Sequence, residues 1–341
     1  MDESTRAAGR PPLGSLPVLV YDHGLDLAKN RQTAFAVADQ SLHTQVVPEL
    51  VSNYYDVTPH GWVLLVAPGP SPRTRLWDPR SGATVSLPAM EHELPEQWKC
   101  RLSDAPTAPS CVVLVLHMAE PRFLYCRAGD AGWSVHDYDI GWSMLPPEYK
   151  PPERIVIQQA AAAAGRFYFR EAGKLGVVDF PPASTAPPEF SYHGFPRVVF
   201  PDGSSCCRGY LVESHGEVFE VYVYLKGRTP EFLTVGVYKI HLPSPGRAAT
   251  VSKVDDLGDR AFLLSYPNAQ LLCSASRYGL KGNRVYFMHN VIAEPDGGLL
   301  HVYDMGERSL ETVRPCPEMT ELLCNPFWML PTDIADFAAS E

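Results

Sequence analysis

The chain has 341 residues, enough for one large domain or two ordinary ones, and 45% of them are hydrophobic, so it can form a substantial core. Its 33 prolines argue against a helix-rich fold, because proline breaks helix interiors. The net charge of −10 disfavours nucleic acid and anionic membrane surfaces as partners, since both attract basic proteins. We therefore expect no nucleic-acid partner and no membrane partner.

The N-terminal segment does not resemble a targeting signal. Residues 1–15 contain Asp2 and Glu3 and lack the basic start and apolar run of a secretory signal. The longest apolar run, Cys111–Leu116, is far shorter than the roughly 20 residues of a membrane-spanning helix. These features predict an intracellular protein, located in the cytoplasm, the nucleus or both.

The cysteines lack the spacing of a metal site. There are eight, and none forms a Cys-x-x-Cys motif; they stand at positions 100, 111, 126, 206, 207, 273, 316 and 324. Without a secretory signal or ligand spacing, buried reduced thiols are a better interpretation than a zinc site or a disulfide framework. We expect no metal and no cofactor.

Short strand-like runs, rich in Val, Tyr, Phe and Leu, recur along the chain between clusters of Gly, Pro, Asp and Ser. They form six units of about 50 residues. The leading strands of these units are Leu16–Asp22, Gly61–Val66, Cys111–Leu116, Gly165–Phe169, Gly209–Ser214 and Asn283–Phe287. Besides them, Ala160–Ala164 is predicted to be a buried strand edge and Glu318–Cys324 a short helix.

Units of this size predict an all-β fold, a β-propeller with six four-stranded blades. The competing all-β fold is the two-layer sandwich, which holds about 100 residues per domain and would require linkers. The two proline-rich candidates, Pro146–Pro152 and Pro181–Pro188, are short enough to be loops between strands. We therefore predict one propeller domain over residues 16–331, between an N-terminal tail, residues 1–15, and an acidic tail, residues 332–341.

The first unit lacks one strand, and the end of the chain offers an apolar run that could supply it. A terminal strand that completes the first blade would join the two ends of the ring and remove an exposed sheet edge. We predict that Phe327, Trp328 and Leu330 close the ring beside Val18–Tyr21. The alternative is an apolar tail packed over the last blade.

Common catalytic motifs, including Gly-x-Ser-x-Gly, the P-loop and His-Glu-x-x-His, do not occur. The cluster Glu91–Glu93 is predicted to be a solvated loop, and His215 with Glu213 and Glu217 the turn of a hairpin. Glu213 is the only acid in the strands assigned to the inner ring, and one carboxylate makes a poor acid–base pair. We expect no catalytic residues.

Tryptophan offers one route to a binding site. Trp62, Trp98, Trp133 and Trp142 are expected to fill the space between twisted sheets, which is the usual place of this side chain. The alternative is that they line a groove for a ligand or a peptide. A small-molecule or glycan-binding propeller, with aromatic side chains near its central channel, therefore remains the second hypothesis.

The feature of the sequence that most specifically indicates a protein family is an ordered series of segments in the C-terminal third. The segments are Gly209–Ser214, Val235–Ile240, Asp256–Leu263, Cys273–Ser276, Gly279–Phe287 and His301–Asp304. With His60–Leu64 and Trp77–Pro88 they resemble the plant family called domain of unknown function 295, the KIB-type β-propeller of F-box proteins. The resemblance covers roughly residues 16 to 331.

The resemblance implies a protein-interaction function. Such propellers present loops to a target protein, in some relatives a signalling kinase, while an N-terminal F-box docks on the Skp adaptor of a ubiquitin ligase. Only fifteen residues precede the first predicted strand, too few for an F-box, so direct docking on Skp is not expected. The first hypothesis is a non-enzymatic interaction propeller; a propeller hydrolase and a paralogue without a retained role are further alternatives.

Overall fold

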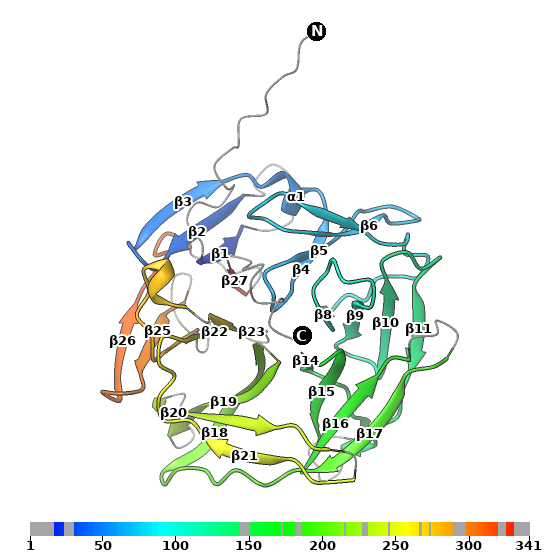
Figure 1. Cartoon of the computed structure of the whole chain (residues 1–341). Helices are drawn as coiled ribbons and strands as arrows, with labels where there is room; N and C mark the ends of the chain where they lie inside the picture. The colour runs from blue at the N-terminus through cyan, green and yellow to red at the C-terminus, as the bar shows by residue number, and fades with distance from the viewer. Residues whose placement is uncertain are drawn as a thin grey trace.

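The computed structural model describes residues 17–23, 31–143, 151–171, 173–181, 186–214, 216–226, 231–244, 246–265, 268–272, 274–288, 298–319 and 325–330. Within them, six β-sheets stand as blades around a common axis, which confirms the predicted propeller (Figure 1). The predicted tails, residues 1–15 and 332–341, and most of the predicted helix Glu318–Cys324 lie outside the described residues.

Blades 1 to 3 each contain four antiparallel strands. From the axis outwards they are β27 (Phe327–Met329), β1 (Val18–Asp22), β2 (Gln32–Ala36) and β3 (Ser41–Gln45); β4 (Tyr54–Val57), β5 (Val63–Val66), β6 (Thr74–Trp77) and β7 (Thr84–Ser86); and β8 (Trp98–Leu102), β9 (Val112–His117), β10 (Arg122–Arg127) and β11 (Ser134–Asp137).

Blades 4 and 5 have the same design, and blade 6 has a fifth strand. From the axis outwards they are β14 (Ala161–Ala163), β15 (Arg166–Glu171), β16 (Lys174–Asp179) and β17 (Glu189–Gly194); β18 (Ser204–Ser214), β19 (Glu217–Lys226), β20 (Glu231–His241) and β21 (Thr250–Lys253); and β23 (Asn268–Leu272), β22 (Ala261–Ser265), β24 (Arg284–Met288), β25 (Leu300–Asp304) and β26 (Ser309–Val313).

Three small elements lie outside the blades. They are the hairpin β12 (Trp142–Ser143) and β13 (Glu153–Arg154), the helix α1 (Pro48–Val51) and the 3-10 turn η1 (Ser276–Tyr278). Across the described ranges, no helix is long and apolar enough to cross a membrane.

The inner ring differs from the sequence prediction. Gly61–Val66 and Gly165–Phe169 were expected to line the axis, but they correspond to β5 and β15, which are second strands. The strands at the axis are β4, β8, β14, β18 and β23, with β27 in blade 1. The sequence prediction missed β4 and β8, because the short runs YYDV and WKCRL mix charged with apolar residues and lack the pattern used to find strands. Ala160–Ala164 is confirmed as a buried strand, because Ala161–Ala163 form β14.

The hydrophobic core consists of six layers, one between each pair of neighbouring blades. One layer, for example, joins Leu64 and Leu76 of blade 2 to Val113 and Leu124 of blade 3. The other five layers occupy the remaining blade interfaces in the same way. Because both faces of a blade are buried in this way, each blade depends on both of its neighbours.

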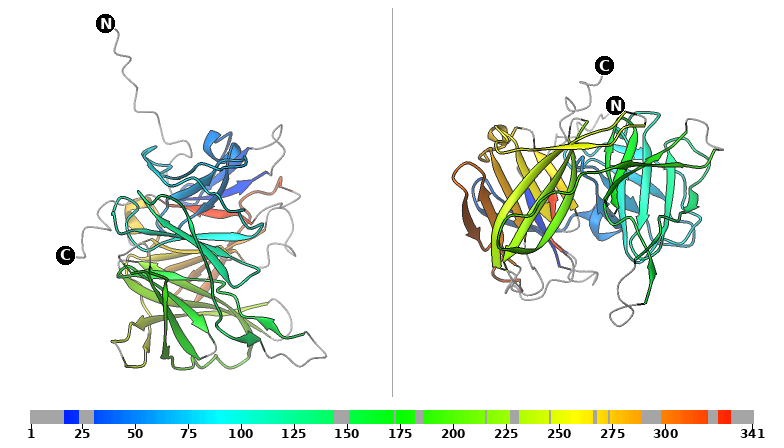
Figure 2. Two further views of the ribbon diagram at one scale, coloured as in Figure 1. Left: turned by 90° about the vertical axis from the view of Figure 1, so that its right-hand side faces the viewer. Right: turned by 90° about the horizontal axis from the view of Figure 1, so that it is seen from below.

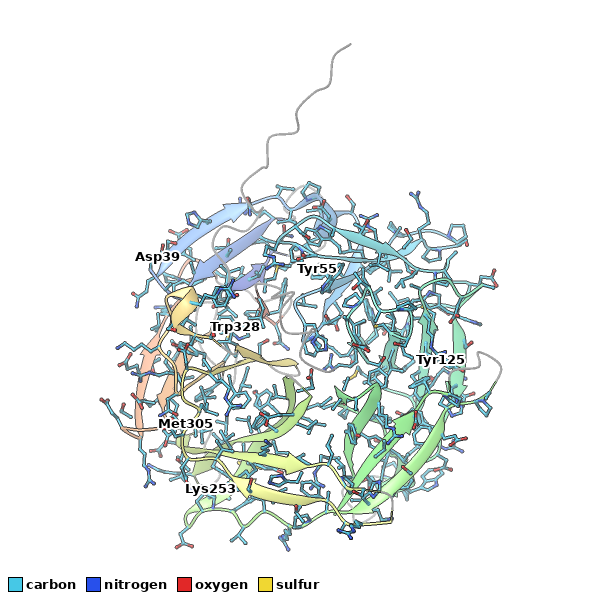
Figure 3. The ribbon with its side chains drawn as sticks, in the orientation of Figure 1. Asp39, Tyr55, Tyr125, Lys253, Met305 and Trp328 are labelled. Atoms are coloured by element: carbon cyan, nitrogen blue, oxygen red, sulfur yellow. The ribbon has the colours of Figure 1, made fainter. Side chains whose placement is uncertain are left out.

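The predicted closure of the ring is present. Strand β27 pairs antiparallel with β1, with Leu19 opposite Trp328 and Val20 opposite Phe327. Trp328, labelled in Figure 3, packs with Leu330 in the layer toward blade 6. Phe327 packs in the opposite layer, toward blade 2. The last strand therefore contributes to two core layers as well as to the sheet of blade 1.

Blade 6 departs from the predicted four strands. Strand β22 pairs with β24 in parallel, with Phe262 opposite Val285. Parallel neighbours require a long crossover connection, and here the chain forms β23 and η1 between them. Strand β23 pairs with the free edge of β22, which gives this blade its fifth strand.

The antiparallel order of the blades distributes the connections over two faces. In blades 2 to 5, the loops between second and third strands and the blade-to-blade connections lie on one face, which we call the crossover face. It includes residues 118–121, 138–143, 151–160 and 195–203. The hairpin β12–β13 belongs to this face, and in Figure 2 it stands out from the ring as a green projection.

Replacement of Trp328 tests the closure. Trp328→Ala is expected to reduce the free energy of unfolding by about 3–5 kcal/mol, because it leaves a cavity where blades 1 and 6 meet. Urea denaturation of the full chain measures this loss. Leu310→Ala on the exposed strand β26 is the control and should change stability by about 0.5 kcal/mol or less. Similar losses in both variants would contradict a closing function for Trp328.

Candidate functional site

Polar side chains near the centre of the ring form hydrogen bonds between neighbouring blades. The Asp56 carboxylate on β4 accepts hydrogen bonds from the Lys99 ammonium at 2.8 Å and from the Cys100 amide at 2.7 Å, both on β8. Gln159 donates to the Gly209 carbonyl at 2.9 Å. These contacts connect blade 2 to blade 3 and blade 4 to blade 5.

Arg101 makes the corresponding contact between blades 3 and 4. Its Nε donates to the Ala160 carbonyl at 3.0 Å, and its Nη1 donates to the Cys100 carbonyl at 2.7 Å. Burial lowers the pKa of this guanidinium, while the charge of Asp56 opposes that shift. A buried cation that satisfies backbone carbonyls is costly to remove, so Arg101 has a structural function.

A further contact crosses the ring. His60, in the turn between β4 and β5, lies with its Nε2 3.5 Å from the Glu213 carboxylate at the end of β18. Blades 2 and 5 stand on opposite sides of the axis, so this pair bridges the channel (Figure 1). The predicted hairpin turn is confirmed, because β18 and β19 pair antiparallel up to Ser214 opposite Glu217, although His215 itself lies outside the described residues. The Glu213 side chain is nevertheless only 8% exposed, because it points toward His60 across the channel.

Glu217, the other acid of that predicted turn, joins blade 5 to the connection into blade 6. Its carboxylate contacts the Lys239 ammonium and the Arg260 guanidinium, the latter at 3.1 Å. Partial burial opposes ionisation, but the hydrogen bond from Lys239 and the two cations leave the pKa of Glu217 below its ordinary value. This acid is therefore held as a structural anion.

The arrangement of acids and histidines in the described residues does not resemble a known catalytic set. The inner ring holds Asp56 as well as Glu213, so the prediction of a single inner acid is wrong, but each carboxylate has its own protein partner. Across the described ranges, no three His, Cys, Asp or Glu side chains are placed to hold a metal ion. Glu91–Glu93 are exposed in a loop, as predicted.

One cluster on the outer rim has the residue types of a nucleophilic triad. The Ser41 hydroxyl donates to Asp39 at 2.7 Å and lies 3.2 Å from His43 Nε2. In a triad the acid orients the histidine, whereas here Asp39 binds Ser41, whose hydrogen bonds lower the pKa of Asp39. Figure 3 shows Asp39 at the outer edge of blade 1, away from the axis.

The tryptophans separate into two groups. Trp62, Trp98 and Trp133 pack in the layer between blades 2 and 3, as expected of core residues. Trp142, on β12, is 51% exposed. The expectation of core packing is therefore correct for the first three and wrong for Trp142. The Gly141 that precedes Trp142 and the prolines that follow it were signals that this residue stands in a connection.

The crossover face carries further exposed apolar side chains beside blade 4. In the connection from blade 4 to blade 5, Val199 is 85% exposed and Phe200 is 43% exposed. Trp142 belongs to the connection from blade 3 to blade 4. Exposed large apolar side chains in loops on a rigid framework are typical of a protein-binding surface.

Phe200 is anchored by tyrosines of β19. Its ring centroid lies 5.3 Å from that of Tyr224 and 6.2 Å from that of Tyr222. Gly236 makes room for this cluster, because a Cβ there would lie 2.8 Å from the Tyr224 ring. Burial raises the pKa of both tyrosines, so both hydroxyls remain neutral at physiological pH. The packing of Phe200 on these tyrosines therefore fixes the position of the neighbouring Val199.

The described cysteines carry free thiols, and most are buried. Cys100, Cys111, Cys126 and Cys316 are buried, as predicted, whereas Cys206 is exposed and Cys207 is partly exposed. Burial raises the pKa of Cys111 to about 12 and that of Cys207 to about 11. Cys273 and Cys324 lie outside the described residues.

The fold and these sites define a six-bladed β-propeller whose inner polar side chains join its blades and whose crossover face exposes apolar loops. The sequence matches the family described as KIB1-4 beta-propeller over residues 34–306, and the chain belongs to this family. No curated protein matches the sequence.

Solved structures of other propellers resemble the chain weakly. A protein proposed to be a 6-phosphogluconolactonase from Bacteroides fragilis is 8% identical, with 96% of this chain and 99% of that chain covered and a TM-score of 0.46. The WD40 domain of SCAP from fission yeast is 9% identical, with coverage of 98% and 91% and a TM-score of 0.31. Likenesses of this size carry no argument about function.

Thiol labelling tests the burial of the cysteines. At pH 8 a thiol with a pKa near 12 is ionised to roughly one part in ten thousand, and only thiolate reacts with iodoacetamide. We expect rapid modification of the exposed Cys206 and none of Cys111 in the native chain, measured by peptide mass spectrometry. In denaturant the two should react alike. Equal rates in the native chain would contradict this structure.

Proposed function

We propose that this chain is a non-enzymatic protein-interaction propeller that recognises a partner protein through the connections beside blade 4. The observation that carries this proposal is the exposure of Trp142, Val199 and Phe200 on the crossover face. Membership in the KIB1-4 family supports an interaction function over an enzymatic one.

The inner ring is consistent with a scaffold. Asp56, Arg101 and Gln159 hold neighbouring inner strands together, and His60 with Glu213 bridges the channel. A catalytic site needs groups that are free to exchange protons with a substrate. Here the charged groups already bind other charged groups or backbone carbonyls of the protein, so loops rather than the channel are the better place for recognition.

The partner class follows from the family. The resemblance to propellers of F-box proteins supports recognition of a target protein, with a signalling kinase as one candidate. The free thiols of the described cysteines support an intracellular location, cytoplasmic or nuclear. The net charge of −10 would attract basic surfaces of such a target.

Val199→Asp tests the face. An added charge at the centre of an apolar interface is expected to reduce recovery of the partner by roughly tenfold or more, because the charge would lose its water on binding. The measurement is affinity purification of the tagged full chain from cell extract, with quantitative mass spectrometry. Val46→Asp is the matched control, since Val46 is 60% exposed in the connection between blades 1 and 2.

Proteins that bind the wild type and Val46→Asp but not Val199→Asp would support the proposal. Equal recovery by all three chains would place recognition elsewhere. Recovery of chaperones alone would contradict the interaction function. A purified Skp-type adaptor, added separately, tests direct docking on a ubiquitin ligase; we expect none, and binding of the adaptor would contradict that expectation.

A further inference from the structure

We infer that the hollow beside the β12–β13 hairpin receives an arginine side chain from the bound partner. This inference rests on the proposed function and names the chemistry of one part of that surface. The hollow has a volume of about 1050 Å³. Its walls come from the β9–β10 loop, the hairpin and the end of β15, and they include Met118, Pro121, Trp142, Glu153, Arg154 and Glu171.

The walls of the hollow are held by hydrogen bonds. At the base of the hairpin, the Ile155 amide donates to the Gly141 carbonyl at 2.9 Å, and the Gly141 amide donates to the Asp139 carboxylate at 3.0 Å. On the other side, the Gln158 amide group donates to the Met118 carbonyl at 3.1 Å. The first two contacts close the base of the hairpin, and the third fixes the segment that follows the hairpin to the β9–β10 loop, so the base of the hollow exists before a partner binds.

The Trp142 ring already lies beside a guanidinium. Arg154 is directly opposite Trp142 in the hairpin register, and its Cζ lies 5.6 Å from the ring centroid. Tryptophan is the best aromatic partner for a cation, and half of this side chain is exposed to solvent. A second guanidinium can therefore stack against the indole as part of a bound segment.

Two carboxylates in the walls of the hollow supply the opposite charge. Glu153 and Glu171 line the hollow. The pKa of the neighbouring Tyr192 is raised, first by its partial burial and then by the negative charges of Glu171 and Asp139. Against these three acids stand Arg154 and Lys174, the latter over the Tyr192 ring at 5.6 Å. The balance is negative, as it is for the whole chain.

Arginine fits this hollow better than lysine does. Its planar guanidinium can stack on an indole and donate to carboxylates in the same plane, whereas an ammonium is a compact, strongly hydrated charge. The combination of an exposed tryptophan with carboxylates in one hollow therefore points to an arginine of an extended basic segment as the occupant.

A peptide experiment tests the inference with the purified full chain. The probe is a fluorescein-labelled nonapeptide of repeated Arg-Gly-Ser, and its binding is followed by fluorescence anisotropy. The comparison peptide has citrulline at each arginine position, which keeps the shape and removes the charge. We expect the arginine peptide to bind about tenfold more tightly than the citrulline peptide.

Substitutions in the hollow locate the binding. Trp142→Ala should weaken binding of the arginine peptide about tenfold, and Trp142→Phe, which keeps an aromatic ring, should weaken it less. Glu171→Gln should weaken it about threefold, with the difference shrinking as salt is added. The matched controls are Tyr54→Ala, at a residue 52% exposed on β4, and Glu311→Gln on β26, and both should bind as the wild type does. Thermal unfolding verifies that each variant is folded.

Equal affinity for the two peptides would overturn the inference, as would wild-type binding by Trp142→Ala or equal losses in the control variants. These results are independent of the proposed function. If the peptide fails to bind while Val199→Asp still abolishes partner recovery, the interaction surface stands and only the arginine assignment falls. If the peptide binds as expected but no partner is recovered, the arginine site stands and the proposed interaction function falls.

Discussion

The burial of both faces of every blade is the constraint on which this structure depends. A sheet of four or five short strands cannot form a core by itself, and here each blade shares one apolar layer with each neighbour. Every blade has both faces buried only when the ring is closed. Trp328 and Phe327 close it, because these residues of β27 pack in the two apolar layers on either side of blade 1.

The polar inner ring follows from the same constraint. Near the axis the blades approach one another closely, so groups on one inner strand reach the backbone of the next. Asp56, Arg101 and Gln159 use this proximity to bind amides and carbonyls of the neighbouring blade. Buried polar groups with satisfied hydrogen bonds fix the relative positions of the blades. A fixed ring in turn holds the connections of the crossover face, where the exposed apolar side chains lie.

The number of blades and their closure could be predicted because they depend on strong local signals. Runs such as Val63–Val66 and residues 112–116 are continuous and apolar, since both of their faces are buried. Two of the inner strands, β4 and β8, could not be found in this way. Tyr54–Val57 and Trp98–Leu102 mix apolar with charged residues, and those charges are explained only by contacts with another blade.

The exposed apolar loops of the crossover face and the contact across the channel were harder to predict from the sequence. Trp142 has the residue type of a core filler, and only its place between a glycine and a proline-rich stretch indicates a loop. His60 and Glu213 are 153 positions apart, and no local pattern connects them. Their proximity depends on the ring bringing blades 2 and 5 to opposite sides of one axis.

The position of β27 in the chain also affects biosynthesis. Because a ribosome makes the polypeptide from its N-terminus, Val18–Asp22 are synthesised long before the strand that covers their edge. Until Phe327–Met329 leave the exit tunnel, β1 lacks its inner partner strand and the apolar layers on either side of blade 1 are incomplete. Unpaired edges of this kind favour association with other chains. The ring therefore cannot close before β27 has been synthesised, and a product terminated before Phe327 keeps an unpaired edge at β1 that can pair with other chains.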